Sequence, residues 1–301
     1  MKLFPARLVL TIGVLLVGLV LLVARLEGVP VRIAHGHNLR TDALSGMRSR
    51  VVMPAARLAA RCFATAGIGC SREAVQALFG ANRKRKYGVL HCGIDLAPFR
   101  PAGKTNDLRA KLGISGAKVV GLVASFTPQK NHQFLISVFA EIFQRDGSAY
   151  LLLVGDGPLR GAIERQIHAL GISSRVILAG QTPAVPEFLK QVIDVFVMTS
   201  TYEGLPLAVL EAQAAGIPCV VSEAVTEEAK VWDGVTRMPL AHGPKGWADA
   251  ILSILQTPRE PHSRALENVA RSDFNLEVSA ARLDKLYVDG LAQARAEGIR
   301  P

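Results

Sequence analysis

Cysteine, aromatic residues and metal-binding spacings are scarce in this sequence. The 301 residues include four cysteines, which form no Cys-x-x-Cys pair and have no histidine at metal-ligand spacing. A zinc site or a disulfide framework is therefore not expected, and a reducing cytoplasm fits the cysteine content best. Asp-x-Asp does not occur, and Tyr87 is the only aromatic residue among the clustered basic ones. The stacking platform of a single-strand nucleic-acid binder is therefore missing.

Acidic residues are rare in the first part of the chain. Residues 1–116 hold 18 Lys and Arg against 5 Asp and Glu, a net charge of +13, whereas residues 117–301 hold 17 against 20, a net charge of −3. A basic surface can face anionic lipid, a phosphorylated acceptor or nucleic acid, although the run Arg-Lys-Arg-Lys at 83–86 is equally typical of a solvated loop. No nucleic-acid-binding motif accompanies the charge, so we expect no nucleic-acid partner.

One long apolar run lies near the start, where Leu8 to Ala24 form 17 consecutive uncharged positions. This length is at the lower limit for crossing a bilayer. The run continues into Arg25-Leu26-Glu27 without a small-residue cleavage site, so removal as a signal peptide is not expected. It also shows no amphipathic stripe, which leaves a membrane anchor or a buried helix. Of these two interpretations we favour attachment to the membrane.

Short apolar runs alternate with stretches of helical period from about residue 117 onward, which is typical of an α/β fold with a doubly wound parallel sheet. Ligands bind such sheets outside the carboxyl ends of the strands, so the loops that follow the strands are the expected binding surface. Five runs predict strands that are covered on both faces: Lys118 to Ala124, Ala149 to Val154, Arg175 to Ala179, Asp194 to Thr199 and Pro218 to Ser222.

The front of the chain predicts a smaller α/β domain. Val31 to Ala34 and Ala64 to Gly69 are expected to be strands, and Ser71 is expected to cap the helix that follows. Pro98 and Pro101 indicate a linker that ends near residue 116. We therefore divide the chain into an apolar segment, a partial N-terminal domain with its linker, a C-terminal domain and a closing helix, over residues 1–27, 28–116, 117–275 and 276–301.

The densest chemical signal is the segment Glu203-Gly-Leu-Pro-Leu-Ala-Val-Leu-Glu211. Pro206 favours a helix start, so Glu211 is expected on the helix and Glu203 in the loop before it. Backbone N–H groups at this helix start, within residues 204–207, would face an anion such as a diphosphate. Two glutamates at this spacing are by themselves more typical of a solvated face.

Neighbouring loops favour a binding role for this segment. Lys130 supplies a mobile cation for a phosphate, next to Asn131 at another helix start. Gly155-Asp156-Gly157 predicts a tight turn through which backbone can approach a ligand closely. Because no Asp-x-Asp occurs, a metal ion is not the expected means of neutralising a diphosphate.

These motifs resemble family 4 of the retaining glycosyltransferases, and within it the bacterial capsular and exopolysaccharide transferases. The resemblance is carried by Thr127 to His132, Leu151 to Pro158 and Asp194 to Gln213, and it continues through Gly216 to Glu223. It extends back to Arg32 to Asn38 and Cys70 to Gly80, so it covers nearly everything after about residue 28. It implies a GT-B fold of two Rossmann-like domains, the N-terminal one truncated and preceded by the apolar segment.

The resemblance also implies the ligand and the roles of its contacts. A UDP- or GDP-hexose would bind the C-terminal domain without metal or other cofactor, with Glu211 on the ribose, Lys130 on the diphosphate and Glu203 on the donor sugar. His37 would lie near the reacting sugar, which makes Glu203, Lys130 and His37 the catalytic set, although a strand-end histidine is often satisfied locally. The donor-binding set is Ser125, Asn131, Gly155, Asp156, Gly157, Gly180, Gly204, Leu205, Pro206, Leu207 and Glu211.

Two departures from the family pattern accompany this resemblance. The family has Gly-Arg where this chain has Ala124-Ser125, so one phosphate-binding cation is absent. The family's first strand and its glycine-rich loop are expected to have no counterpart, since the apolar run takes their place. The implied activity is transfer of a sugar, with retention of configuration, to a lipid-linked or polysaccharide acceptor at the cytoplasmic membrane face. The alternative is a non-catalytic sugar-nucleotide-binding or scaffolding subunit.

Overall fold

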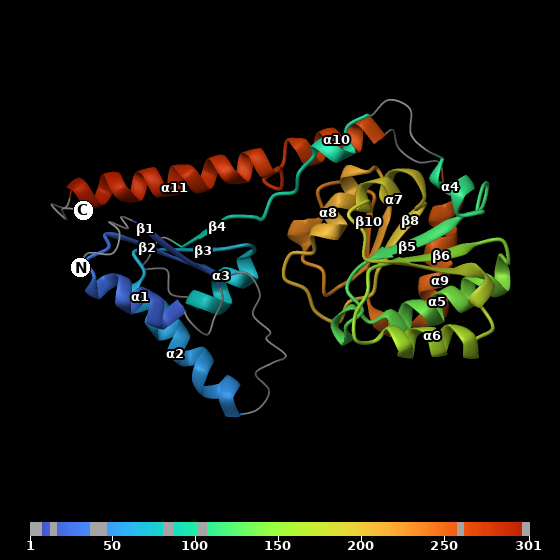
Figure 1. Ribbon diagram of the computed structural model, residues 1–301, viewed down its shortest axis with the longest axis horizontal. Helices are drawn as coiled ribbons and strands as arrows, with labels where there is room; N and C mark the ends of the chain where they lie inside the picture. The colour runs from blue at the N-terminus through green and yellow to red at the C-terminus, as the bar shows by residue number, and fades with distance from the viewer. Residues whose placement is uncertain are drawn as a thin grey trace. The chain divides into compact units, whose positions relative to one another are not determined.

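The computed structural model divides the chain into two compact units, which are described here one at a time (Figure 1). The first contains residues 1–93 and 276–301, and the second contains residues 94–275. The structure describes residues 8–12, 17–36, 47–80, 87–101, 107–257 and 262–296.

The division between the units falls at Gly93 and Ile94, earlier than the boundary near residue 116 that the prolines suggested. The reason is burial, because Ile94, Phe99 and Ile114 belong to the hydrophobic core of the second unit. The segment interpreted as a linker is thus part of the second unit. Its helix α4, Leu108–Lys111, is fixed there by Arg109, which donates to Asp194 Oδ2 over 2.8 Å.

The first unit is built on a parallel four-stranded sheet of order β1-β2-β3-β4. The expected strands near residues 31 and 64 are confirmed as β2 and β3, and Ser71 caps α3 by accepting a hydrogen bond from Ala74 N over 3.1 Å. The elements are β1 Leu8–Ile12, α1 Val17–Leu26, β2 Val31–Gly36, α2 Met47–Phe63, β3 Ala66–Gly69, α3 Arg72–Phe79, β4 Tyr87–Val89 and α11 Leu276–Ala296.

The closing helix predicted after residue 276 is present as α11 and belongs to the first unit, although it follows the second along the chain. Leu283, Leu286 and Leu291 of α11 pack against the buried cluster that contains Val31 and Ile33 of β2. Ser279 of α11 adds a 2.6 Å hydrogen bond to the carbonyl oxygen of His91. Apolar burial and this bond together account for the return of the chain to the first unit.

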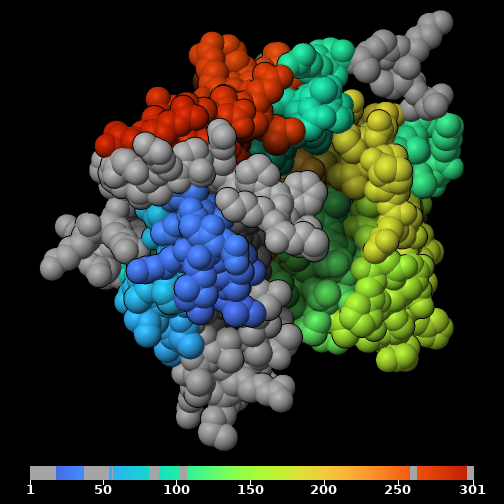
Figure 2. All heavy atoms as spheres, turned by 60° about the vertical axis from the view of Figure 1, so that its left-hand side comes forward, coloured from blue at the N-terminus to red at the C-terminus, as the bar shows by residue number. Residues whose placement is uncertain are grey.

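The apolar run from Leu8 to Ala24 forms neither a single spanning helix nor a single buried one. Its first part is strand β1, which pairs in parallel with β2, and its last part lies in helix α1. Leu21 and Ala24 of α1 are buried, whereas Leu19 and Val23 are exposed. Helix α1 lies within the blue surface in Figure 2. Over the described ranges of the chain, no helix has the length and apolar character needed to cross a membrane.

The second unit has a parallel six-stranded sheet of order β10-β9-β8-β5-β6-β7. The five strands predicted from the sequence are confirmed. The four interior strands are almost entirely buried, as expected for strands covered on both faces, whereas the edge strand β7 is only partly buried. β10 was not predicted, because it is an edge strand in which only Val235 is buried. The strands are β5 Val119–Val123, β6 Tyr150–Val154, β7 Val176–Gly180, β8 Val195–Met198, β9 Cys219–Ser222 and β10 Val235–Met238.

Helices cover both faces of this sheet (Figure 1). Helices α5, α6 and α9 lie on one face, and α7, α8 and α10 lie on the other. The α-helices are α5 His132–Arg145, α6 Arg160–Ala169, α7 Val185–Gln191, α8 Leu207–Ala214, α9 Gly243–Gln256 and α10 His262–Ala270. Short 3₁₀ turns are Ala97–Phe99, Pro128–Lys130, Ser173–Arg175, Glu227–Ala229 and Leu240–His242.

The strand order places a topological switch point between β5 and β8. The chain proceeds from β5 outward to β6 and β7, then returns to β8 and proceeds the other way to β9 and β10. The loops that leave β5 and β8 therefore diverge at the carboxyl edge of the sheet, which is where ligands bind in open α/β sheets. The two most conspicuous sequence motifs, around Lys130 and Glu203, lie in these two loops.

Candidate functional site

The loops after β5 and β8 are joined by hydrogen bonds between their backbones and side chains. Thr201 N donates to Gln129 O over 2.9 Å, and Thr199 Oγ1 donates to Asn131 O over 3.0 Å. Asn131 has a φ of 52°, a left-handed conformation that asparagine tolerates better than most residues and that redirects the chain into α5. The two loops, which lie far apart in the sequence, are thus held together.

Lys130 and Glu203 form an ion pair at this surface. Lys130 Nζ lies 2.7 Å from Glu203 Oε1, and the two side chains are 18% and 4% exposed. The 3₁₀ turn Pro128–Lys130 presents the lysine, and the loop before α8 presents the glutamate. The sequence predicted both residues at the site but not the contact between them. A cation held by a carboxylate at a sheet switch point can exchange that partner for a phosphate.

Helix α8 begins directly after this pair. Pro206 is its N-cap and Val209 N donates to Pro206 O over 3.1 Å, whereas helix geometry leaves the N–H groups of Leu207 and Ala208 without intrahelical acceptors. Gly204 and Leu205 connect the ion pair to this helix start. Positive dipole and available N–H groups make such a start favourable for an anion.

Glu211 lies on α8, as the sequence predicted, and it is half-buried. Burial raises the pKa of its carboxyl above the usual value for glutamate. A desolvated carboxylate strongly favours hydrogen-bond donors that replace its lost water. Hydroxyl groups of a ligand can supply such donors.

The glycine-containing turn after β6 packs tightly against the loop after β5. Gly155 has a φ of 138°, and a Cβ on it would lie 2.0 Å from Ala124 O. A Cβ on Gly157 would lie 2.7 Å from Phe126 O. Gly155 N also donates to Gly180 O at the end of β7, over 2.8 Å. These contacts require glycine at both positions, and they place Gly180 at the same edge of the sheet.

Asp156 is oriented within that same turn. Its Oδ1 accepts a 2.7 Å hydrogen bond from Gly157 N, and its Oδ2 lies 3.1 Å from Arg160 Nη1. The backbone oxygen of Asp156 accepts from Phe126 N over 2.9 Å. The aspartate therefore stabilises the turn in addition to any contact with a ligand.

His132, the first residue of α5, is a buried neighbour of the ion pair. The residue is 1% exposed, and its ring packs edge-on against Phe126, with centroids 4.7 Å apart. Burial, and then the charge of Lys130, lower the pKa of His132 to about 4. The imidazole is consequently neutral at physiological pH, and the cation at this site is Lys130.

The structure brings most of the predicted donor-site residues to one edge of the second unit, but two predictions need separate mention. Ser125 is exposed in the loop after β5. His37 lies outside the described residues. Gln129, Thr199 and Thr201 hold the site together but were not predicted, since polar residues in a loop give no periodic signal.

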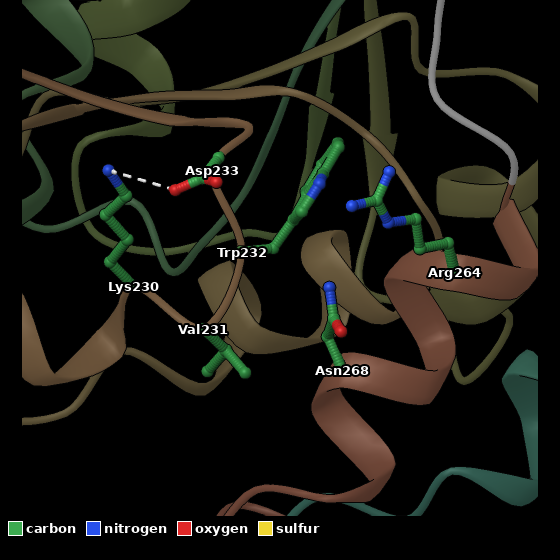
Figure 3. Close-up of a pocket in the computed structure, with 6 residues that line it drawn as sticks. All are labelled: Lys230, Val231, Trp232, Asp233, Arg264 and Asn268. Atoms are coloured by element: carbon green, nitrogen blue, oxygen red, sulfur yellow. Dashed lines mark ion pairs between the residues drawn. The ribbon is translucent and has the colours of Figure 1, made fainter.

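A separate cavity of about 220 Å³ lies in the second unit, between α10 and the segment before β10 (Figure 3). The neighbouring Gly234 accepts a hydrogen bond from Cys219 N at the start of β9, so the cavity is at the amino edge of the sheet, opposite the switch point. Its lining residues are Lys230, Val231, Trp232, Asp233, Arg264 and Asn268. It is distinct from the candidate site.

Comparisons with known proteins agree with this arrangement. Residues 104–273 match the family described as Glycosyl transferases group 1. EpsF of Bacillus subtilis, a protein assigned by name to the glycosyltransferases, is 34% identical over 275 residues, which are 90% of this chain and 71% of EpsF. The UDP-Gal:alpha-D-GlcNAc-diphosphoundecaprenol alpha-1,3-galactosyltransferase of Escherichia coli is 35% identical over 142 residues, 46% of this chain and 36% of that protein.

Solved structures share the fold at lower identity. Alr3699/HepE of Anabaena, crystallised with UDP and glucose, superposes with a TM-score of 0.76 over 94% of this chain and 78% of that one, at 19% identity. This similarity confirms the predicted GT-B class of α/β fold. Given the match over residues 104–273 and the similarity to EpsF along most of both chains, the protein belongs to the group 1 family of glycosyl transferases.

Proposed function

We propose that this chain transfers a hexose from a UDP- or GDP-sugar to a lipid-linked or polysaccharide acceptor, with retention of configuration and without a metal ion. The observation that carries the proposal is the buried Lys130–Glu203 pair at the switch point, directly before the start of α8. The family membership and the UDP and glucose named for the HepE structure support a nucleotide-sugar donor.

In this proposal each side chain acts on a different part of the donor. Lys130 and the first N–H groups of α8 bind the diphosphate. Glu211 accepts hydrogen bonds from the ribose, which replace the water that burial removed. Glu203 positions the donor sugar, and the glycine turn at residues 155–157 admits the ligand close to the backbone.

The reaction requires stabilisation of a leaving diphosphate while the anomeric carbon gains positive charge. Preoriented cations and N–H dipoles provide this stabilisation. Neither glutamate is assigned as a nucleophile, since Glu203 is proposed to position the donor sugar and Glu211 to bind the ribose. The leaving phosphate itself then accepts the proton of the acceptor hydroxyl on the face from which it departs, which accounts for retention.

The acceptor and the place of action are proposed on separate grounds. The relative from E. coli has a diphosphoundecaprenol-linked acceptor in its name, and the first 116 residues of this chain are strongly basic. Both features suit an anionic lipid-linked acceptor at the cytoplasmic face of the membrane. His37 is proposed to lie near the reacting sugar, on the acceptor side.

Transfer of label from a panel of radiolabelled UDP- and GDP-sugars tests this proposal. The full chain is incubated in chelator with membrane lipid extract, and the lipid-soluble product is analysed for anomeric configuration by NMR. We expect one donor to give a product with the configuration of the donor. Inverted product would refute retention, and tight nucleotide-sugar binding without transfer to any acceptor would favour a non-catalytic binding subunit.

A further inference from the structure

Gln129 precedes Lys130 and contacts the opposite loop through both its backbone and its side chain. Its carbonyl oxygen accepts from Thr201 N over 2.9 Å and from Thr201 Oγ1 over 3.3 Å. Its side-chain Nε2 lies 2.9 Å from Tyr202 O and 3.4 Å from Glu203 Oε2. An amide nitrogen has two hydrogens, so one can be directed at each acceptor.

The consecutive residues Gln129 and Lys130 therefore contact different oxygens of the Glu203 carboxylate. Lys130 Nζ contacts Oε1 of Glu203 over 2.7 Å, and the Gln129 amide faces Oε2. The lysine is a charged group on a flexible stem. The glutamine amide also donates to Tyr202 O, and the backbone of Gln129 is held by Thr201 on the same loop. The ion pair with Lys130 is therefore easier to break than the hydrogen bond from Gln129.

Binding of the donor is expected to break one of these two contacts of Glu203 and to leave the other. When Lys130 turns to a diphosphate, Glu203, whose side chain is 4% exposed, loses its ion pair with Lys130 and retains the amide of Gln129. A buried carboxylate left without a donor is costly, and it would also be free to rotate. The remaining hydrogen bond limits both effects.

We propose that Gln129 is a positioning residue, which keeps the Glu203 carboxylate aimed at the donor sugar while Lys130 binds the diphosphate. This inference rests on the proposed function of the site. Gln129 acts through Glu203 and touches no reacting atom. Its loss is therefore expected to lower kcat more than it weakens binding of the nucleotide portion.

Two substitutions separate this role from a merely structural one. Gln129→Ala removes the amide but keeps the backbone bonds to Thr201. Gln129→Glu keeps the shape, repels Glu203 when ionised, and regains a donor when protonated. The titratable groups near residue 129 are Lys130, Tyr202, Glu203 and His132, and the pKa of about 4 keeps His132 neutral across the assay range. Gln133→Glu, at an exposed position on α5, is the matched control.

The kinetic test compares transfer from pH 8 to about pH 5.5, each variant being normalised to the wild type at the same pH. We expect kcat of Gln129→Glu to be about tenfold low at pH 8 and to recover several-fold at the lower pH. Gln129→Ala should be low throughout, and Gln133→Glu should follow the wild type. A kcat of Gln129→Ala within twofold of wild type, or a Gln129→Glu variant without recovery, would overturn the inference.

Calorimetry with UDP and with UDP-sugar distinguishes failure of this inference from failure of the proposed function. If the wild type binds neither of these ligands, and neither GDP nor a GDP-sugar in the same assay, the proposed function is wrong and the inference falls with it. If the wild type binds both, the Gln129 variants should keep their affinity for UDP and lose affinity for the sugar-bearing donor. Equal loss for both ligands would show that Gln129 only maintains the loops.

Discussion

The Lys130–Glu203 pair can be tested in the free protein by Lys130→Met, which removes the charge but keeps an unbranched side chain. Glu203 would then remain 4% exposed without its cation. Removing one partner of a buried pair costs about 3 to 5 kcal/mol. Lys130 is 18% exposed, so water can reach the pair in part, and we expect a loss at the lower end, about 3 kcal/mol.

Tryptophan fluorescence gives an assay that is specific to the second unit. The chain has two tryptophans, Trp232 and Trp247, and both lie in that unit. Urea unfolding followed by their emission therefore reports the unit that contains the pair, even if the two units unfold separately. With a slope of about 2 kcal/mol per molar urea, the midpoint should fall by about 1.5 M.

A double-mutant cycle separates the pair from other effects of the substitution. Lys130→Met with Glu203→Gln leaves no buried charge, so it should regain about 2 kcal/mol relative to Lys130→Met alone. Lys118→Met, at an exposed position on the same unit, should leave the midpoint unchanged. A Lys130→Met midpoint equal to that of the wild type, or effects that simply add in the double variant, would refute the buried pair.

Three further outcomes follow from the site. Ser125→Arg should tighten UDP binding about fivefold in calorimetry and leave uridine binding unchanged, since a guanidinium here would contact phosphate; equal effects on both ligands would contradict this. Glu211→Gln should weaken UDP binding about five- to tenfold, whereas Glu203→Gln should alter UDP binding little. Because burial raises the pKa of the Glu211 carboxyl, Glu211→Gln should also stabilise the free protein at neutral pH. A similar loss of UDP affinity in both variants would contradict the assigned roles. Burial lowers the pKa of His132 to about 4, so between pH 6.5 and 4 the unfolded chain binds more protons than the folded one. The contribution of His132 to stability should be full above pH 6.5 and fall by about 3 kcal/mol as pH drops toward 4. His132→Phe should remove this loss in urea unfolding, and parallel pH curves for the variant and the wild type would contradict the assignment to His132.

The interior strands of the second unit could be predicted because a strand covered on both faces must be apolar throughout. The edge strand β10 could not, since Thr236 is exposed and Arg237 is only partly buried. β1 could not be predicted because Leu8–Ile12 belongs to the same uninterrupted apolar run as most of α1. Composition alone does not show where a strand ends and a helix begins in such a run. Only pairing with β2 defines the strand.

The candidate site shows the same limit at the level of contacts. Loop chemistry identified Lys130 and Glu203, and the glycine spacing identified Gly155 and Gly157. The ion pair joins residues 73 positions apart, and the role of Gln129 depends on where its amide is placed by Thr201 and Tyr202. Such contacts depend on strand order, which no local pattern in the sequence specifies.

Nucleotide binding to the second unit is the central claim, and calorimetry of the full chain with UDP and GDP in chelator tests it most directly. We predict that one nucleotide binds with a Kd of about 10 to 100 µM, equivalent to about 6 kcal/mol. The Lys130→Met/Glu203→Gln variant, which keeps the fold but lacks the cation, should bind it at least about tenfold more weakly. Absence of heat with either nucleotide from folded protein, or equal binding by this variant, would contradict the account.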